Sequence, residues 1–577
     1  MANNYMTEYQ KWLDSGVLTE SEHAELVSIK DDPKEIEARF YGPLEFGTAG
    51  LRGTMKVGLH HMNNYVVRHA TQGFANVISA EGDAAKKRGV AICMDCRLHS
   101  MDFARAAAEV MVGNGIHVRI FESLRPTPEL SFAVREYHCQ AGINITASHN
   151  PKEYNGYKVY WEDGAQLPPQ HADAIARQLE KIDIFNDIRS IPYEEGLASG
   201  MITVMGEECD ERFMRNVMSM ANAPDMVASM ADRFKVVYTP FHGCGYILVP
   251  LALRRLGMKH VICEPQQMVI DGNFPTVKSP NPENPEGFYL AVELAKKHGA
   301  TLIVGTDPDA DRVGIMVRDD QGEYIPFTGN QTGALLCDYL IGAKQRAGTM
   351  PEKPAVLKSI VSSEMVRAIA ERNGVSCFDT FTGFKFMAEK IGQFEAEHSY
   401  NAIFSFEESY GYMIGNYVRD KDAVTASMLI VEMACWYASQ GMTLFDALNA
   451  LYEKYGYFAE KTYNLVMPGL DGLAKMAQLM ENLRSNPYAE IASTPVSEFK
   501  DYQDGSVLDV QTGRKTYMEL SGSNVLRFEL VDGTSFIVRP SGTEPKIKVY
   551  VLTAGSSPES AAERIDRYGA FVQQMQA

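Results

Sequence analysis

The sequence predicts an α/β fold: three similar mixed-sheet α/β domains followed by a smaller α+β C-terminal domain around a central cleft. Short β-rich apolar runs alternate with longer helical stretches such as Phe103–Asn114 through most of the chain, and this alternation is typical of mostly parallel sheets. Beyond about Val507 the pattern changes to short strands separated by turns, and then to one final helix.

The predicted strands are short apolar runs rich in β-branched residues. The five clearest are Val90–Cys93, Ile143–Thr146, Lys235–Tyr238, Thr301–Val304 and Ala402–Phe406. Three of them lead directly into a polar loop, with the sequences T-A-S-H-N-P, G-T-D-P-D-A-D-R and E-E-S-Y-G-Y. Open α/β sheets bind their ligands at the carboxyl ends of strands. One such loop in each of three units favours three similar domains.

The chain has 577 residues, which is more than one hydrophobic core usually serves. Glycine-containing or polar stretches occur near Gly196–Gly206, Gly322–Gly329 and Gly441–Tyr457. We therefore predict domains at 1–205, 206–325 and 326–455, each with one of the three polar loops. The fourth domain, 456–577, contains the segment R-P-S-G-T-E-P-K.

The charge and the cysteine content restrict the possible partners. With 55 basic and 74 acidic residues the formal net charge is −19, which disfavours nucleic acid and anionic membranes and requires clustered cations for any anionic substrate. Nine cysteines favour reduced thiols in the cytosol, with Cys93 and Cys96 both within a buried strand. The N-terminus lacks the pattern of a signal peptide, and no run approaches the ~18 apolar residues of a membrane span. We expect a cytoplasmic protein.

Three aspartates follow one of the predicted strands at alternate positions, Asp307, Asp309 and Asp311. An extended backbone would direct all three carboxylates to one side, where they would require a cation. Oxygen ligands without histidine or cysteine favour Mg²⁺. An EF-hand does not fit, because Arg312 and Arg318 stand where its glycine and glutamate belong. The alternative is an ordinary solvated acidic loop.

Ser148 follows another predicted strand and directly precedes His149. A hydroxyl projecting from a turn beside a base candidate suits a nucleophile, although an ordinary serine in an Asn/Pro turn is the commoner interpretation of such a segment alone. Lys158 lies ten residues later on a further predicted strand. It is close enough in sequence to return to the same cleft and exchange protons with a substrate hydroxyl.

Three further segments have the composition of phosphate or sugar sites. R-P-S-G-T-E-P-K combines a guanidinium, hydroxyls and a flexible glycine, as a phosphate cradle requires. G-T-A-G-L-R-G places an arginine in a glycine-flanked loop, and E-E-S-Y-G-Y offers acceptors for sugar hydroxyls. Plain turns remain the alternative for each. The residues concerned are Arg539, Ser541, Gly542, Thr543, Arg52, Glu407 and Ser409. No P-loop motif is present, and H-G-C-G-Y-I-L lacks the third glycine of a dinucleotide loop.

From about Gly47 onward, this set of motifs resembles the α-D-phosphohexomutase superfamily of phosphoglucomutases and phosphomannomutases. The resemblance implies that Ser148 is a phosphoserine and joins Asp307, Asp309 and Asp311 in holding Mg²⁺. It also implies acid/base catalysis by Lys158. It further implies that Arg52, His149 and Arg312 line the cleft, that Glu407 and Ser409 bind the sugar, that Arg539, Ser541, Gly542 and Thr543 bind phosphate, and that Lys385 and Lys358 contact substrate.

The resemblance implies interconversion of glucose 1-phosphate and glucose 6-phosphate, with Mg²⁺ as cofactor and glucose 1,6-bisphosphate as activator and intermediate. Phe406 stands where many members have glycine, and with Y-G-Y-M it resembles the branch of phosphoglucomutase-2 and phosphopentomutases. Phosphopentomutase, phosphomannomutase, sugar-1,6-bisphosphate synthase, phosphatase and non-catalytic binding functions remain open. We expect small-molecule sugar phosphates as partners, and a monomer or homodimer.

Overall fold

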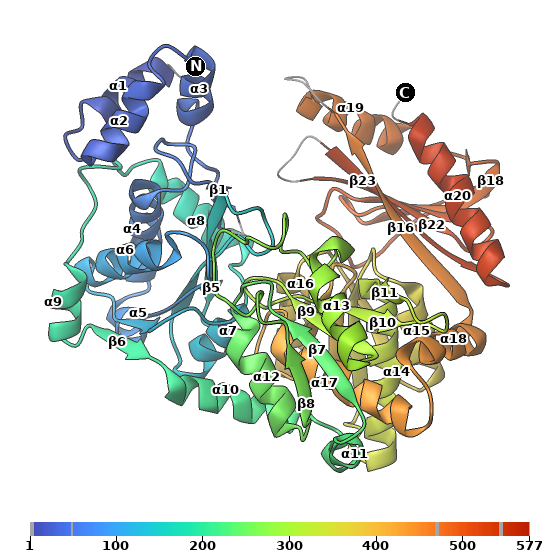
Figure 1. The fold of residues 1–577 in the computed structure, drawn as a ribbon. Helices are drawn as coiled ribbons and strands as arrows, with labels where there is room; N and C mark the ends of the chain where they lie inside the picture. The colour runs from blue at the N-terminus through green and yellow to red at the C-terminus, as the bar shows by residue number, and fades with distance from the viewer. Residues whose placement is uncertain (1–4, 48–49, 468–471, 542–545, 576–577) are drawn as a thin grey trace. The chain divides into compact units, whose positions relative to one another are not determined.

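The computed structural model describes residues 5–47, 50–467, 472–541 and 546–575 (Figure 1). The chain forms two compact units. The first combines Met1–Thr328 with Ser409–Thr443, and the second combines Gly329–Glu408 with Leu444–Ala577. Each unit contains segments that are distant in sequence, because the chain enters the second unit, returns to the first and then completes the second.

The first sheet of the first unit is mixed. Its strand order is β1-β5-β4-β2-β3-β6, with β2, β3, β4 and β6 parallel and β5 antiparallel to both β1 and β4. The strands are β1 (Leu51–Thr54), β2 (Val90–Met94), β3 (Val118–Phe121), β4 (Ala141–Ile145), β5 (Tyr154–Trp161) and β6 (Ile202–Met205). The accompanying helices are α4 (Asn64–Ala80), α5 (Asp83–Arg88), α6 (Ser100–Gly113), α7 (Thr127–Glu136), α8 (Pro169–Leu179) and α9 (Tyr193–Ala198).

Three short helices precede this sheet, and the sequence patterns had not indicated them. They are α1 (Tyr5–Leu13), α2 (Glu20–Ser28) and α3 (Pro33–Phe40). Trp12 is fully buried, and its ring packs edge-on against Phe40, Tyr65 and Phe185 at centroid distances of 5.2–5.8 Å. Aromatic burial of this kind attaches the three helices to α4 and to the segment after α8.

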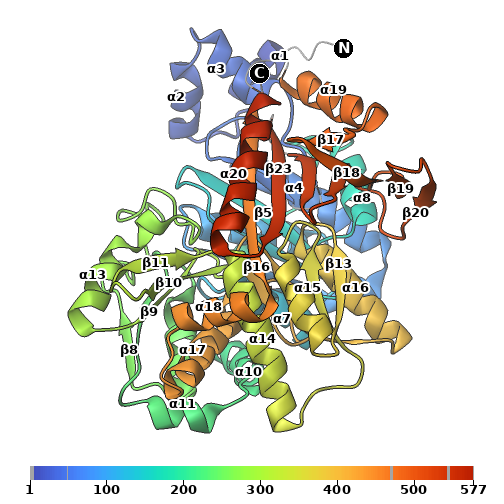
Figure 2. The same ribbon diagram turned by 90° about the vertical axis from the view of Figure 1, so that its right-hand side faces the viewer.

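The second sheet of the first unit has the order β11-β10-β9-β7-β8. Its strands β7 (Lys235–Thr239), β8 (His260–Cys263) and β9 (Leu302–Thr306) are parallel, and β10 (Val313–Arg318) and β11 (Tyr324–Phe327) are added antiparallel. The helices are α10 (Glu207–Ser219), α11 (Pro224–Met230), α12 (Gly245–Arg255), η1 (Pro285–Phe288), α13 (Tyr289–His298) and α17 (Ala423–Ser439). Figure 2 shows α13 beside this sheet, and the mostly buried α17 packs on α11 and α12.

The second unit begins with the parallel strands β12 (Pro354–Ser359), β13 (Ser376–Thr380) and β14 (Asn401–Glu407), with β12 between the other two. Its helices are α14 (Gly329–Ala347), α15 (Glu364–Arg372), α16 (Phe384–Glu397) and α18 (Leu444–Tyr455). Strand β15 (Gly411–Met413) belongs to the returning segment of the first unit. The predicted strand Ala402–Phe406 is confirmed.

An antiparallel sheet completes the second unit, in the order β16-β23-β22-β21-β18-β19-β20, with β17 on β18. The strands are β16 (Tyr457–Val466), β17 (Glu490–Ile491), β18 (Thr494–Asp501), β19 (Ser506–Asp509), β20 (Lys515–Tyr517), β21 (Leu526–Leu530), β22 (Ser535–Pro540) and β23 (Lys546–Gly555). The helices are α19 (Gly472–Ser485) and α20 (Pro558–Gln574), and Figure 1 shows α20 along β16 and β23. The sheet thus begins well before Val507, because β16 pairs along its whole length with β23.

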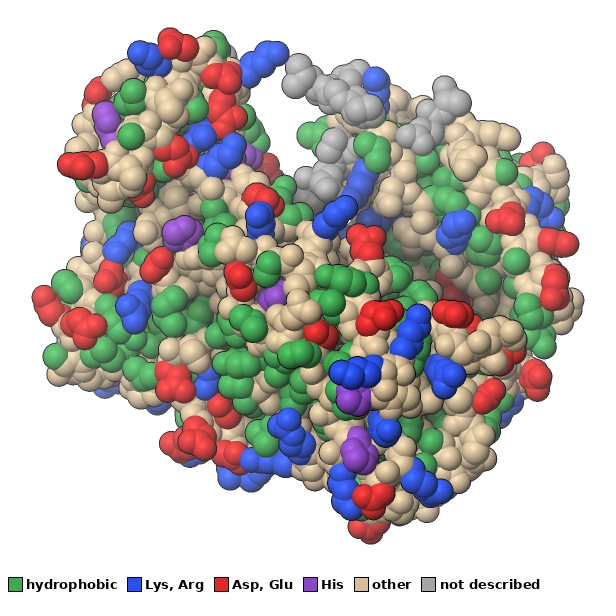
Figure 3. Space-filling view, viewed as in Figure 1, with side chains coloured by type: hydrophobic (Ala, Val, Ile, Leu, Met, Phe, Trp, Pro, Cys, Tyr) green, Lys and Arg blue, Asp and Glu red, His purple; other side chains and the backbone are tan. Residues whose placement is uncertain are grey.

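The surface charges are mixed in sign, and the cysteines are unpaired. On the face drawn in Figure 3, acidic and basic side chains are interspersed rather than segregated by sign. All nine cysteines are free thiols, and Cys93 is fully buried in β2 while Cys96 lies just beyond that strand. Among the described helices, none combines the length and the apolar character needed to cross a bilayer.

Candidate active site

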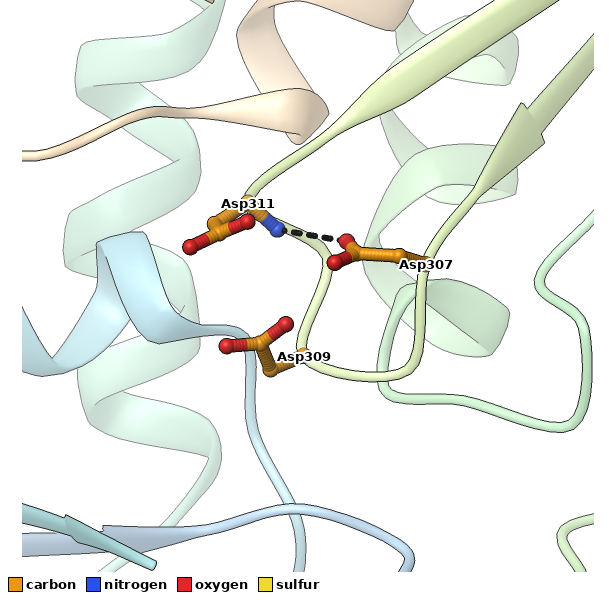
Figure 4. Close-up of side chains that lie close together, drawn as sticks. All are labelled: Asp307, Asp309 and Asp311. Atoms are coloured by element: carbon orange, nitrogen blue, oxygen red, sulfur yellow. Dashed lines mark hydrogen bonds between the residues drawn. The ribbon is translucent and has the colours of Figure 1, made fainter. Parts of the chain in front are cut away.

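The three aspartates lie in the tight turn that joins β9 to β10 (Figure 4). The two strands are antiparallel, with Thr306 opposite Val313, so the chain must reverse within a few residues. Ala310 adopts a left-handed φ of +50° in this reversal. The expected extended backbone is therefore wrong, and it is the turn that brings one carboxylate oxygen of each aspartate within 4.8 Å of the others.

The turn leaves particular carboxylate oxygens for a ligand. Asp307 Oδ1 accepts the backbone N–H groups of Asp311 at 3.1 Å, dashed in Figure 4, and of Arg312 at 3.0 Å. In contrast, Asp309 Oδ1 and Asp311 Oδ1 are buried and have no hydrogen-bond partner among the described residues. Leaving anionic oxygens buried without partners is costly. These oxygens fit a bound divalent cation, which would coordinate them directly.

The electrostatics of the turn support the same conclusion. Burial, together with repulsion from Asp309 and Asp311, raises the pKa of Asp307 well above its ordinary value. The pKa of Asp309 is lowered: burial opposes its charge, but Lys158, whose Nζ lies 2.8 Å from Asp309 Oδ2, outweighs that effect. The ionised forms of three buried carboxylates repel one another, so a bound cation would stabilise the fully ionised cluster.

Ser148 lies against this turn. It follows β4 with a left-handed φ of +51°, held by a hydrogen bond of 2.8 Å from its N–H to Thr146 Oγ1. Its hydroxyl donates to Asp307 Oδ2 at 2.9 Å, and His149 Nδ1 lies 3.2 Å from Ser148 Oγ. The side chains of Ser148 and the aspartates, about 160 residues apart in sequence, thus meet at one place. Only 4% of Ser148 is exposed, so solvent reaches it little.

Arg97, which no sequence motif indicated, holds the Ser148 loop in shape. Its guanidinium donates to the carbonyl oxygens of Ser148 and Asn150 at 2.6 and 2.5 Å, and to those of Pro151 and Tyr154 at 2.8 and 3.0 Å. One buried side chain therefore satisfies four carbonyls of an irregular loop. Its position directly after a strand, in M-D-C-R, is the signal that could have indicated it.

The basic residues near Ser148 differ in protonation. Burial, with the nearby Arg312 and Arg52, lowers the pKa of His149 well below its ordinary value, so the ring is neutral. For Lys158 burial opposes the charge, but Asp309 and Asp311 outweigh it and raise the pKa, so the amine stays protonated. Arg52 donates to Asn150 Oδ1 at 3.0 Å and Arg312 pairs with Glu283 at 2.9 Å.

A second lysine, also missed, reaches the aspartates from the returning segment. Lys421 Nζ lies 3.1 Å from Asp311 Oδ2 and 3.1 Å from Asp420 Oδ1. Asp420 is fixed in turn by the hydroxyl of Tyr160 at 2.9 Å and by Gln166 Nε2 at 3.1 Å. The alternating charges of V-R-D-K-D before the apolar α17 could have indicated a buried polar cluster here.

Several predicted residues lie in the second unit. Glu407 ends β14, and one of its carboxylate oxygens accepts the backbone N–H of Gly383. Lys385 stands in the first turn of α16, with Nζ 4.9 Å from the ring centroid of Phe386. Arg539 is the next-to-last residue of β22, opposite Lys548, and Ser541 donates its N–H to the carbonyl of Lys546 at 2.8 Å. Gly542 and Thr543 lie outside the described residues, and Ser409 begins the segment that returns to the first unit.

Lys358 has partners other than those expected. It is fully buried in β12, and Nζ lies 3.1 Å from Glu364 and 3.0 Å from Asp379. Arg367 and Arg527 pair with the same two carboxylates at 2.7 and 3.4 Å. The charge of Lys358 is thus already compensated within the protein, as in a structural ion-pair cluster.

Replacing Lys358 with methionine is expected to destabilise the second unit by about 3 kcal/mol. This is the lower end of the cost of breaking a buried pair, because Arg367 and Arg527 still pair with the carboxylates. Urea unfolding of the full chain, followed by circular dichroism, would measure it, because the three tryptophans all lie in the first unit. The control is Lys454→Met, since Lys454 pairs with Asp338 at the surface and should contribute little. Equal midpoints for the two variants would contradict the structural role.

The chain matches the models of all four phosphoglucomutase/phosphomannomutase domains. Alpha/beta/alpha domain I matches residues 43–185, domain II 211–322, domain III 328–455 and the C-terminal domain 470–566. Phosphoglucomutases of Staphylococcus aureus are among the similar curated proteins. The protein of strain N315 is 37% identical over 538 residues, and that of strain USA300 is 36% identical, each covering 93% of this chain and 94% of the relative.

Solved structures agree at the level of the fold. The open form of parafusin, a phosphoglucomutase from Paramecium, superposes with a TM-score of 0.69 at 18% identity, covering 92% of this chain and 96% of that one. A phosphoglucomutase/phosphomannomutase family protein from Burkholderia thailandensis gives 0.65 at 18% identity, covering 92% and 97%. With four domain models matched in order and relatives covered over nearly their whole length, this chain belongs to the phosphoglucomutase/phosphomannomutase family of the α-D-phosphohexomutase superfamily.

Proposed function

We propose that this protein is a phosphoglucomutase, which interconverts glucose 1-phosphate and glucose 6-phosphate. The observation that carries the proposal is the hydrogen bond of 2.9 Å from the Ser148 hydroxyl to Asp307, within a cluster of three buried aspartates. The S. aureus relatives, named phosphoglucomutases, support the choice of reaction. Retention of the serine, the aspartates and Lys158 in one contact network disfavours a purely binding function.

In the proposed reaction, Ser148 carries the phosphoryl group between the two ends of one sugar. The bond from phosphorus to Ser148 Oγ breaks as a bond forms to the free hydroxyl of the sugar phosphate, which gives a bisphosphate. After the bisphosphate turns round, its other phosphoryl group returns to Ser148 Oγ. Asp307, Asp309 and Asp311, with an oxygen of phosphorylated Ser148, would hold Mg²⁺, which supplies charge neutralisation for the transferring group.

The protonation states assign the proton transfers. Lys158 stays protonated beside Asp309 and Asp311, so it can donate a proton to an oxygen from which the phosphoryl group departs. His149 is neutral, with Nδ1 3.2 Å from Ser148 Oγ, so it can accept the proton that the attacking hydroxyl loses, that of the sugar in the first transfer and that of Ser148 on the return. Passage of a proton from His149 to Lys158 after each transfer resets both groups. The low exposure of Ser148 limits the access of water, which would otherwise hydrolyse the phosphoserine.

For the remaining residues the proposal rests on the family resemblance. We assign Arg52 and Arg312 to the phosphate and Glu407, Ser409 and Lys385 to the sugar. Arg539 and Ser541, together with Gly542 and Thr543, are assigned to the distal phosphate. Lys358 is left out, because protein carboxylates already pair with it. The domain limits 1–205, 206–325, 326–455 and 456–577, a cytoplasmic location, and a monomer or homodimer likewise stay predictions.

The native chain is expected to convert α-D-glucose 1-phosphate to glucose 6-phosphate with Mg²⁺ and a trace of glucose 1,6-bisphosphate. Coupling the product to glucose 6-phosphate dehydrogenase measures the rate. Parallel assays replace the substrate with mannose 1-phosphate and ribose 1-phosphate, and another follows inorganic phosphate. A higher kcat/KM for ribose 1-phosphate would replace this proposal with a phosphopentomutase, and stoichiometric phosphate release would replace it with a phosphatase.

A further inference from the structure

The turn that bears the aspartates is held by three segments that are distant in sequence. The carbonyl of Pro308 accepts the N–H of Cys244 at 2.8 Å, that of Asp309 accepts the N–H of Thr127 at 2.8 Å, and that of Ala310 accepts the N–H of Ala423 at 3.2 Å. Three consecutive carbonyls therefore have protein donors, and the side chains are the groups that remain for a ligand.

The contact with Cys244 explains the motif H-G-C-G, which resembled a dinucleotide loop only superficially. At Gly243 an added Cβ would lie 2.6 Å from the carbonyl oxygen of Pro308. Glycine at this position thus allows the loop after β7 to approach the backbone of the aspartate turn.

Thr127, at the start of α7, binds the turn through its side chain as well. Its hydroxyl donates to Asp309 Oδ2 at 2.8 Å, and it accepts a hydrogen bond from Asn144 Nδ2 at 2.7 Å. Thr127 and Asp309 are 0% exposed and Asn144 is 1% exposed, so water does not compete for these bonds. The three side chains form a linear chain of hydrogen bonds that ends on a candidate metal ligand.

The donors and acceptors of this chain have fixed directions. The side-chain NH₂ of Asn144 can only donate, so the hydroxyl of Thr127 accepts there and turns its single proton to Asp309. Asp309 Oδ2 then has two donors, Thr127 Oγ1 and Lys158 Nζ, each at 2.8 Å. Because Oδ2 is occupied in this way, Oδ1, which has no hydrogen-bond partner among the described residues, is the oxygen left for a cation.

We propose that Thr127 and Asn144 are positioning residues that fix the carboxylate of Asp309 with Oδ1 presented to the metal ion. Their importance for catalysis rests on the proposed function, but their effect on metal affinity does not. Lys158 Nζ is shared between Asp309 at 2.8 Å and Asp311 at 3.6 Å, whereas the hydroxyl of Thr127 is fixed by Asn144 and turned to Asp309.

The test is a titration of the full chain with Mn²⁺, followed by electron paramagnetic resonance, which counts free ion without any assay of activity. Thr127→Val removes the hydroxyl and keeps the branched shape. It is expected to weaken Mn²⁺ binding by about 10- to 100-fold, the usual cost of losing a partner of a metal ligand. Thr127→Ser keeps the hydroxyl and is expected to bind within about threefold of the native chain.

A matched control separates positioning from a general loss of packing. Thr71→Val also removes a buried hydroxyl from the first unit, where it bonds Val67 O and the Tyr157 hydroxyl, and should leave Mn²⁺ affinity unchanged. If Thr127→Val does not fold, Asn144→Leu, which removes the group that orients the hydroxyl, should weaken binding in the same direction.

A folded Thr127→Val chain with native Mn²⁺ affinity would overturn the proposal, and so would equal losses in Thr127→Val and Thr71→Val. A native chain that binds Mn²⁺ in this Thr127-dependent manner, yet leaves glucose 1-phosphate unchanged, would refute the proposed function and retain the positioning role.

Discussion

Replacing Ser148 with alanine is expected to lower the rate of glucose 1-phosphate conversion by at least about 10⁴-fold, because loss of the group that forms a covalent intermediate removes the reaction path itself. The substitution removes one buried hydroxyl and its bond to Asp307, so the fold should persist. Rates would be measured in the coupled assay, with circular dichroism to verify folding.

Direct labelling makes this result specific to phosphoryl transfer. Native chain incubated with glucose 1,6-bisphosphate labelled with ³²P should retain label on the peptide that contains Ser148, and Ser148→Ala should retain none. Ser199→Ala serves as the control: the Ser199 hydroxyl donates to the Gly196 carbonyl at the end of α9, and the variant should retain native rate and label. Undiminished activity in Ser148→Ala would refute the phosphoserine mechanism, whatever the sugar.

The strands and the order of the chemical motifs could be predicted from the sequence because each is recognisable within its own short segment. A strand such as β9 is recognised by its own apolar run, and the polar loop follows it directly, so neither requires knowledge of distant residues. The helices α1–α3 escaped prediction although Thr19 and Asp32 cap α2 and α3; what could not be seen locally is the packing of Trp12 in α1 against Phe185, far along the chain. Similarly, β16 belongs to the C-terminal sheet only because it pairs with β23.

The residues of the candidate site also divide into those with a local sequence signal and those whose role depends on distant contacts. Ser148 and the three aspartates carry their own signals, whereas Arg97, Lys421 and Thr127 act through contacts made by folding. Thr127 lies in an ordinary T-P helix start, and nothing local distinguishes its hydroxyl from a surface one. Lys358 is the converse case: the family resemblance implied that it contacts substrate, but the carboxylates that neutralise it come from α15 and β13 and could not be seen in its own segment.

Removing the metal is expected to have the second largest effect. Chelation with EDTA should lower the rate of the native chain by roughly 10³-fold, because a cation at a phosphoryl group supplies several kcal/mol of stabilisation in the transition state. Added Mg²⁺ should restore the rate. An EDTA-treated chain, shown by elemental analysis to be metal-free, that keeps its full rate would contradict the assignment of the aspartate turn.

Asp307→Asn tests whether the required metal ion binds at the aspartate turn. The remaining amide oxygen can still accept the N–H groups of Asp311 and Arg312, so the turn should keep its shape while losing one charge next to Ser148. Mn²⁺ affinity should fall by at least about 10²-fold, since a direct ligand is lost and even its supporting partners are worth 10- to 100-fold. Asp210→Asn, which alters an aspartate paired with Arg125, is the matched control and should bind normally.

The same substitution should stabilise the metal-free protein. Burial and the charges of Asp309 and Asp311 raise the pKa of Asp307, so its ionised form is less favourable in the folded chain than in the unfolded one at neutral pH. Removing that charge should raise the midpoint of thermal unfolding in EDTA by a few degrees, and the difference should shrink as the pH falls and native Asp307 takes up a proton. In saturating Mg²⁺ the order should reverse, because the native chain gains binding energy that the variant lacks. A variant with a lower unfolding midpoint than the native chain in EDTA would mean that the Asp307 carboxylate stabilises the fold. The expected result, a more stable variant in EDTA and a less stable one in Mg²⁺, would show that the repulsion among the three carboxylates is relieved by the bound ion.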